Sequence, residues 1–409
     1  MKKRIRKPAH TAYAVTLMGV MGVSAITPAL PEIARAFSIS RQEAGLLVVF
    51  FTLPGIVFSP VTGVVADRFG RKVVVSIAIF LFGVSGFLCT LVNFRTMLLL
   101  RLIQGSSASS LVALSTTIIG DAYEGRERAK IIGYNASILT IGIALYQLSG
   151  GYLASLCWKY PFYMFLLAIP VSIFVLLSPL PEVRSEKSFS EYFRKVGSTF
   201  NRRMYVLFLT GMIAYAILYG TFLTYLPFAI QSAGGSSVRI GEIQATMSLS
   251  TALFAANLTR ISDRIKRVIP AGFTAYGISL IGILISYLLK CEFCFFIPAV
   301  IFGFAQGTVL PTLQHEIVSM TEAEGRAAVM STYGSVSKLG QTTGPAFFGL
   351  FSISGVYEVG SVLAFSIAFL HCLHRSHLNN SQNPHIPHIH RQKNTGGKLS
   401  ESGTKKKKI

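Results

Sequence analysis

The sequence has 409 residues, of which 51% are hydrophobic and only 13% are charged. Because ordinary soluble domains carry about 25% charged residues, this composition excludes a soluble globular protein and predicts an integral membrane protein. The formal net charge of +21 could indicate nucleic-acid binding. The sequence contains no soluble basic domain to carry such binding, so we expect no nucleic-acid partner.

Twelve apolar runs, each bounded by polar or glycine-rich turns, have the length of about 20 residues that crosses a bilayer as a helix. In chain order they cover residues 12–34, 44–66, 73–92, 96–119, 129–152, 159–180, 205–229, 241–259, 269–289, 294–317, 327–350 and 356–374. Spans of a β-barrel would be about ten residues long and alternate in polarity, unlike these runs. The predicted fold is an all-α integral membrane protein with twelve transmembrane helices.

Lysine and arginine residues are distributed unequally between the two sides that these spans define. Most lie in the N-terminal MKKRIRK, in the even-numbered turns and in the C-terminal tail. The opposite side carries Arg35, Arg41, Arg95, Lys159, Arg239 and Lys290. By the positive-inside rule, this pattern predicts a multi-pass protein of the cell membrane with both termini in the cytoplasm. The first run is too long for a signal peptide, so we expect it to be retained.

The longest internal polar stretch, residues 181–203, separates six predicted spans from six. The predicted units are a cytoplasmic tail at 1–11, a six-helix half at 12–180, a cytoplasmic linker at 181–204, a second half at 205–374, and a disordered, basic, His-rich cytoplasmic tail at 375–409. Three motifs recur in order: EGRERAKIIGYNASILTIG with EGRAAVMSTYGSVSKLG, IQGSSA with AQGTVL, and VADRFGRK with ISDRIKR. Duplicated halves of this kind are typical of secondary transporters.

The segment GVVADRFGRKVVV gathers charges between the second and third runs, which otherwise carry almost none. The residues of this segment that we expect to be functional are Gly63, Asp67, Arg68, Gly70 and Arg71. A glycine at 63 lets two helices approach closely, and one at 70 permits a tight reversal. Topology-setting charge alone would explain the arginines, but it would not explain an aspartate at the membrane boundary.

The repeated halves and this charged segment resemble the major facilitator superfamily, and more narrowly its twelve-helix drug:proton antiporter branch, over about residues 10–375. The resemblance implies two pseudo-symmetric six-helix halves that alternate access to a central site. It also implies a small organic substrate and protons as partners, without a cofactor. The charged segment would be a gate on the cytoplasmic side, with Asp67 contacting the second half near the eleventh helix. We expect a monomer.

Two further gating or coupling positions lie at the ends of the fourth span, and a third follows it. Arg101 is an intramembrane arginine, and such residues face the bundle interior unless they snorkel to the headgroups. With Gln104 it resembles the family motif whose arginine is linked to proton transfer. Asp121 ends the span and Arg126 follows in the next turn. The resemblance makes Asp121 a partner of the charged segment, and the alternative is a headgroup-level charge.

Lys338 lies near the middle of the eleventh span, where snorkelling is hardest. With Gln341 one turn away, it can offer donors to an anionic or carboxylate-bearing substrate, and the alternative is structural pairing across helices. None of the 17 acidic residues falls at the centre of a predicted span, so specificity for lipophilic cations is in doubt. Glu32, Gln104 and Gln147 complete the predicted substrate contacts.

Proton carriers are therefore few. The candidates are Asp67, Asp121, Glu32 and the pair His315–Glu316, and the last is equally consistent with a pair at the headgroup level.

Glycine and proline residues mark two predicted bending sites. The antiporter branch usually shows Gly-Pro before paired glycines in the fifth span. Here Gly150 and Gly151 are present, but Tyr146–Gln147 replaces Gly-Pro, which weakens the bend. The eleventh span carries Gly344–Pro345 instead.

Other function classes are excluded by missing motifs. The sequence has no phosphate-binding loop of the Walker type and no hydrolase, kinase or metalloprotease signature, so we expect neither ATP-driven transport nor an enzyme. The five scattered cysteines suggest no disulfide framework, and the lone pair Cys291 and Cys294 suggests no metal site.

The favoured function is proton-coupled export of small amphipathic compounds such as drugs or siderophore-like metabolites. The alternatives are proton-coupled uptake of a polar solute and a transporter-like sensor or scaffold.

Overall fold

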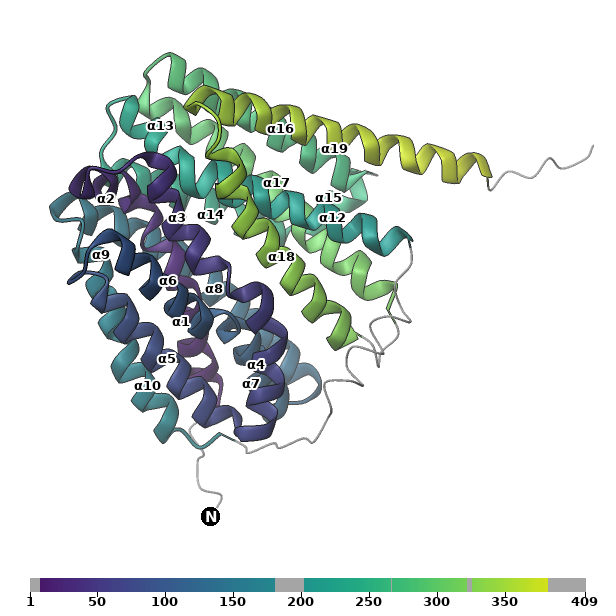
Figure 1. Ribbon diagram of the computed structural model, residues 1–409. Coiled ribbons are helices and arrows are strands. Elements are labelled where there is room, and N and C mark those ends of the chain that lie inside the picture. Colours follow the sequence, from purple (N-terminus) through teal and green to yellow (C-terminus); the bar gives the residue numbers. More distant parts are fainter. Residues whose placement is uncertain (1–7, 181–201, 266, 322–325, 382–409) are drawn as a thin grey trace, which may run out of the picture.

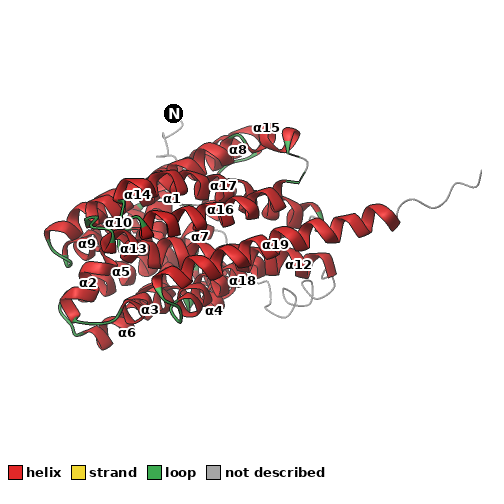
Figure 2. Cartoon of the chain, turned by 90° about the horizontal axis from the view of Figure 1, so that it is seen from above, coloured by secondary structure: helices red, strands yellow, loops and turns green. Residues whose placement is uncertain are grey.

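The computed structural model describes residues 8–180, 202–265, 267–321 and 326–381. Within these ranges the chain is helical and contains no strand (Figure 2). The predicted linker at 181–204 lies almost wholly outside the described residues, as do the first seven residues and the tail from residue 382.

The helices before residue 181 form what we call the first half. Their bounds are α1 Ala9–Ser24, η1 Thr27–Ala29, α2 Leu30–Phe37, α3 Arg41–Thr52, α4 Gly55–Phe69, α5 Arg71–Leu88, α6 Phe94–Ala108, α7 Leu111–Ala122, α8 Gly125–Leu156, α9 Tyr160–Tyr163, η2 Met164–Leu167 and α10 Ala168–Leu177. Several predicted spans are divided into two or three consecutive helices, as the first is into α1, η1 and α2. Pro28 and Pro31 lie in η1 and α2, where they interrupt the regular helix.

The helices after residue 201 form the second half. Their bounds are α12 Arg202–Ile217, η3 Leu218–Tyr225, α13 Leu226–Ser232, α14 Ser237–Ala256, α15 Leu258–Arg264, α16 Val268–Leu288, η4 Glu292–Phe295, α17 Phe296–Ser319, α18 Arg326–Phe348 and α19 Ile353–Ser381. The last helix ends at Ser381 rather than at 374, because its polar residues continue the helix beyond the apolar run from which its end was predicted.

Ten helical segments of the described chain are long and apolar enough to cross a membrane. The other two predicted spans, 241–259 and 327–350, are occupied by α14 and α18, which are helices of 20 and 23 residues. These two helices are less apolar because they carry serine, threonine, glutamine and charged side chains. Helices of this kind are stable in a membrane when their polar faces contact protein rather than lipid.

The chain turns alternately on two faces of the molecule, which we call the terminal face and the far face. Helices α1 and α12 begin on the terminal face, and the turns α2–α3 and α13–α14 lie on the far face (Figure 1). Ser40 begins α3 with a capping box to Glu43, which satisfies amide groups at the helix start. Within the second half, α14 packs on α17 and α16 packs on α17 and α19.

Contacts between the halves are centred on two helices of the second half, α14 and α18. Helix α14 packs on α8, and α18 packs on α3 and α4. In Figure 1 the purple and blue helices of the first half and the green and yellow helices of the second half meet along these elements. The functional site predicted between the halves must therefore be built from the residues along these two contacts.

Candidate functional site

The charged segment forms the turn between α4 and α5 on the terminal face. Helix α4 ends at Phe69 and α5 begins at Arg71, and Gly70 between them has φ +93°. Only glycine adopts this backbone conformation without strain, which explains the residue at this reversal. Arg68 is exposed and its guanidinium lies 5.9 Å from the Phe69 ring.

Arg71 forms an ion pair with Asp121, near the end of α7, so the structure brings these two predicted residues together. Their side chains retain 11% and 18% exposure. Gly63 and Asp67 belong to α4, but their surroundings lie outside the described part, and so does the predicted contact of Asp67 with the second half. Arg126 is exposed in the first turn of α8.

Arg101 is fully buried at the centre of the first half and does not reach the headgroups. Its Nε donates to the Leu47 carbonyl at 3.1 Å, and its Nη2 donates to the Gly22 carbonyl at 2.9 Å. Its guanidinium also lies 4.4 Å from the centre of the Phe51 ring. Arg101 thus ties α6 to α1 and α3 through backbone carbonyls, which need no charged partner.

Gln104 supports this arginine. It accepts from Arg101 Nη1 at 2.7 Å and donates to the Phe82 carbonyl at 3.3 Å. The side chain is fully buried, and both ends of the amide are used inside the protein. Its contact with a substrate stays a prediction.

The contact of α18 with α3 and α4 is a line of residues that we call the α18 seam. One side consists of Lys338, Thr342, Pro345 and Gly349. The opposite side consists of Gly45, Val49, Thr52 and Gly55. Lys338, Thr342 and Pro345 follow at intervals of four and three, which places them on one face of α18, and Gly349 lies just after the end of this helix. In the middle of the seam, the Thr342 hydroxyl donates to the Thr52 hydroxyl at 2.9 Å. Both side chains are buried.

Lys338 lies on the terminal side of that threonine pair. Its Nζ donates to Gln341 Oε1 at 3.1 Å, so the structure brings these two predicted residues together. Its aliphatic stem covers Gly55, where an added Cβ would meet Lys338 Cδ at 2.8 Å. A glycine at this position of α4 leaves the space that the lysine occupies.

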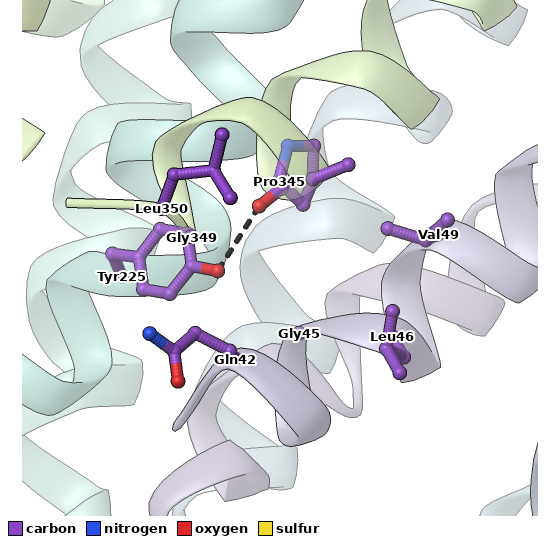
Figure 3. A pocket seen from close by; sticks show the side chains of 9 residues that line it. Gln42, Gly45, Leu46, Val49, Tyr225, Pro345, Gly349 and Leu350 are labelled. Atoms are coloured by element: carbon purple, nitrogen blue, oxygen red, sulfur yellow. Dashed lines mark hydrogen bonds between the residues drawn. The ribbon is translucent and has the colours of Figure 1, made fainter. Parts of the chain in front are cut away.

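An apolar pocket of about 280 Å³ lies on the far side of the threonine pair (Figure 3). Gln42, Leu46 and Val49 line one wall, and Pro345 and Leu350 line the other. The Tyr225 hydroxyl donates to the Pro345 carbonyl at 3.0 Å at the edge of this pocket. The α18 seam therefore carries a cationic group, a polar seal and an apolar pocket, in that order from the terminal side.

The second contact between the halves joins α8 to α14. Gln147 is buried, and its Oε1 accepts from the Ser248 hydroxyl at 2.7 Å. An added Cβ at Gly151 would lie 2.5 Å from the Ser237 carbonyl oxygen and 3.0 Å from Gly241 Cα. Gln147 thus takes part in a contact between the two halves, and its predicted contact with a substrate stays a prediction.

Glu32 lies at the far face, where its carboxylate pairs with Arg35 at 3.1 Å. It also accepts from the Ser237 hydroxyl of the second half at 3.3 Å. Arg41 makes a similar connection, since its Nη2 donates to the Phe351 carbonyl at 2.6 Å. Glu32 is thus part of the far-face contact between the halves, and its predicted contact with a substrate stays a prediction.

The predicted bending residues are all points of close helix contact. Helix α8 is continuous through Gly150 and Gly151. A Cβ at Gly150 would lie 3.0 Å from Ala25 Cα, and one at Gly344 would lie 2.7 Å from Ala216 Cα. Pro345 lies inside α18, where it lacks the amide hydrogen of a regular helix.

Two other groups differ from their predicted arrangement. Glu316 pairs with Arg203 of α12 at 3.3 Å rather than with His315, because neighbouring residues of a helix point in different directions. Cys291 and Cys294 form a disulfide at the far-face turn before α17, although the odd and scattered cysteines suggested none. Within the described ranges, no group of histidine, cysteine and acidic side chains could hold a metal ion.

Sequence reasoning missed the partners across the halves. Thr52, Thr342, Ser248 and Gly55 were not among the predicted residues. A polar and small-residue stripe at intervals of three and four in α18 could have indicated the seam, but the facing residues of α3 and α4 come from a distant part of the sequence.

Comparison with known proteins agrees with this architecture. A family model described as Major Facilitator Superfamily matches residues 12–345 and 234–398. The bacillibactin exporter of Bacillus subtilis (strain 168) is 24% identical over 82% of this chain and 87% of its own length. The quinolone resistance protein NorA of Staphylococcus aureus (strain MRSA252) is 27% identical over 50% of this chain and 55% of its own length. The chain therefore spans about half the length of the NorA relatives that it matches.

Solved structures show the same fold at low sequence identity. The nucleoside transporter NupG (D323A mutant) is 14% identical, with a TM-score of 0.75 over 90% of this chain and 99% of its own. The D-xylose–proton symporter is also 14% identical, with a TM-score of 0.72 over 89% of this chain and 96% of its own. The family match extends over most of the sequence, so the chain belongs to the Major Facilitator Superfamily and is a multi-pass membrane protein.

Proposed function

We propose that the chain exports small amphipathic organic compounds in exchange for protons by alternating access, as a monomer with both termini in the cytoplasm. One observation carries the mechanism. The described hydrogen bonds between the halves all lie between mid-membrane and the far face. A transporter closed on one face and held by such contacts is in one of the two states that alternating access requires.

The far-face contacts define what must open for release. They include the threonine pair of the α18 seam, Gln147 with Ser248, and Thr27, which donates to Gln244 at 3.0 Å. Each is a neutral hydrogen bond of modest net energy, about 0.5–1.5 kcal/mol. A set of such bonds can be broken together within a transport cycle, because their combined energy is only a few kcal/mol.

Proton coupling would use the carboxylates at the two faces. Glu32 accepts from Ser237 across the far face, and Asp121 pairs with Arg71 on the terminal face. An ionised carboxylate accepts a stronger hydrogen bond than a neutral one, so protonation weakens either contact. Protons that reach Glu32 would thus favour opening of the far face, and protons that reach Asp121 would loosen the contact between α5 and α7 within the first half.

The direction of transport rests on the relatives named above. The bacillibactin exporter aligns with most of this chain, and the name of NorA refers to quinolone resistance. The middles of the described spans also lack the acidic residues that a polar-solute symporter with buried acids would need. Export is therefore favoured over uptake.

The test uses inside-out vesicles with an imposed proton gradient and a pH-sensitive dye. Lipophilic cations, neutral amphipaths and carboxylate-bearing amphipaths are added in turn. We expect proton release with at least one class, and its loss in Asp121→Asn. The control variant Glu358→Gln, at an exposed carboxylate of α19, should behave as the unmodified chain. No response to any class in folded protein would contradict proton-coupled export.

A further inference from the structure

The charges inside the membrane-spanning part are not balanced. The described acidic residues lie at or near helix ends, and they are Glu32, Glu43, Asp67, Asp121, Glu124, Glu127, Glu242, Asp263, Glu292, Glu316 and Glu358. Two cations, Arg101 and Lys338, lie inside helices that contribute to spans. An intramembrane cation without an acidic partner is costly unless another group satisfies it.

The two cations are satisfied in different ways. Arg101 is fully buried and donates to two backbone carbonyls and Gln104, so no ligand can reach it in this state. Lys338 is only partly buried, and its one hydrogen bond within the described chain goes to Gln341. An ammonium group has three donor hydrogens, so two remain available.

Gln341 adds a second donor at the same place. Its Oε1 accepts from Lys338. Its Nε2 donates no hydrogen bond to another of the described residues. That NH₂ group belongs to the same amide as the oxygen that accepts from Lys338, so it lies close to the ammonium group. An ammonium and an amide NH₂ together suit the two oxygens of a carboxylate.

The surroundings place this pair at a contact between the two halves. Lys338 covers Gly55 on the terminal side of the threonine pair, and the apolar pocket bounded by Val49 and Pro345 lies on the far side. A molecule that crosses the α18 seam toward the far face would meet the cation first and the apolar pocket after the threonine pair separates. This order suits a substrate with a carboxylate and an apolar body.

We propose that Lys338 and Gln341 bind the carboxylate of an anionic amphipathic substrate. The apolar pocket next to Tyr225 receives the apolar body of the same molecule when the threonine pair opens. This inference rests on the proposed function for its place in the transport cycle, but binding at Lys338 can be tested without transport.

The binding test uses three radiolabelled probes with one apolar body: naphthylbutyrate, its methyl ester and naphthylbutylamine. Each is bound to the purified full chain immobilised in detergent, with protein-free beads as blank. The unmodified chain should prefer the carboxylate. Lys338→Gln should weaken carboxylate binding about 10–100-fold, as expected for a lost charge-assisted hydrogen bond, and change ester binding less than about 2-fold. Lys338→Arg should retain the preference.

The matched control is Lys130→Gln, an exposed lysine of α8 whose Nζ lies 5.7 Å from the Tyr134 ring. It should leave all three affinities unchanged. Equal losses for carboxylate and ester in Lys338→Gln, or a preference of the unmodified chain for the amine, would overturn the anion site. Monodisperse elution of each variant on size-exclusion chromatography separates these outcomes from misfolding.

Transport of the same probes in proteoliposomes separates this inference from the proposed function. If the ester or amine is exchanged for protons while carboxylate binding does not depend on Lys338, the anion site is wrong and export stands. If the carboxylate binds through Lys338 but no probe moves under a proton gradient, export is wrong and the anion site stands.

Discussion

At the scale of single residues, two neighbouring glycines of α8 have different partners. Gly150 faces Ala25 within the first half, and Gly151 faces Ser237 and Gly241 of the second half. Gly150→Ala should destabilise the fold in every state, by about 1–3 kcal/mol, because an added methyl group overpacks a fixed contact. Gly151→Ala should mainly push the halves apart and favour opening of the far face.

Two measurements distinguish these variants, and each variant is the control for the other. Thermal unfolding should shift chiefly in Gly150→Ala. Labelling of Thr27→Cys by a membrane-impermeant maleimide should accelerate chiefly in Gly151→Ala, since Thr27 is buried in the far-face contact. Labelling of the same glycine variants without Thr27→Cys gives the background from the native cysteines, and this background is subtracted. Identical behaviour of both variants would contradict the assignment of these glycines to different contacts.

Arg101 gives a second residue-scale prediction. Arg101→Met leaves the carbonyls of Gly22 and Leu47 without their donor, at a cost of about 1–3 kcal/mol each. Arg101→Lys should also destabilise, because a lysine cannot span both carbonyls and Gln104 with a planar fork. We expect lower melting temperatures for both. A variant Arg101→Met that melts as the unmodified chain but loses proton coupling would favour the proton-transfer role over the structural one.

At the scale of elements, the ion pair of Arg71 and Asp121 opposes the helix dipoles. Arg71 is the first residue of α5, where a negative charge is favoured, and Asp121 is near the end of α7, where a positive charge is favoured. The pair is therefore less stable than its reverse. The pair joins α5 to α7 within the first half, and a weak pair of this kind can rearrange when that half changes shape.

This arrangement predicts the effect of exchanging the charges. The double variant Arg71→Asp/Asp121→Arg should restore the pair and gain about 0.3–1 kcal/mol per charge from the dipoles. Each single variant should lose stability, because it leaves two like charges side by side. Thermal unfolding and transport rate are measured together. We expect the double variant to be more stable and slower than the unmodified chain, and a faster or less stable double variant would refute the dipole argument.

The elements themselves were largely predictable from sequence, whereas their partners were not. Apolar length located each helix of the described spans, because crossing a bilayer fixes that length. The roles of Gln104 and Gln147 were not predictable, since a buried amide can be satisfied by a substrate or by the protein. Lys338 was found because it lies near the middle of its span, where a lysine cannot easily reach the headgroups. Its position beside Gly55 depends on helix packing across the halves, which local sequence does not encode.

At the scale of the whole molecule, the two faces are held together differently. The far face is joined by hydrogen bonds between the halves, including that of Arg41 with Phe351. On the terminal face, the described ion pairs lie within one half, as for Arg71 with Asp121 and Arg203 with Glu316. The halves can therefore separate on the terminal side without losing these contacts, and a transport cycle must break the far-face set.

The threonine pair of the α18 seam tests this requirement directly. The hydroxyl oxygens of Thr52 and Thr342 lie 2.9 Å apart, so cysteine sulfurs in their places need only a small approach to reach the bond length of about 2.05 Å. Mild oxidation of Thr52→Cys/Thr342→Cys should cross-link the halves and stop transport, while binding of naphthylbutyrate from the terminal side persists. Reduction should restore transport, and each single cysteine variant should be unaffected by oxidant. Full transport by quantitatively cross-linked protein would mean that the seam stays closed throughout the cycle and that substrate leaves by another route, most directly along the contact between α8 and α14.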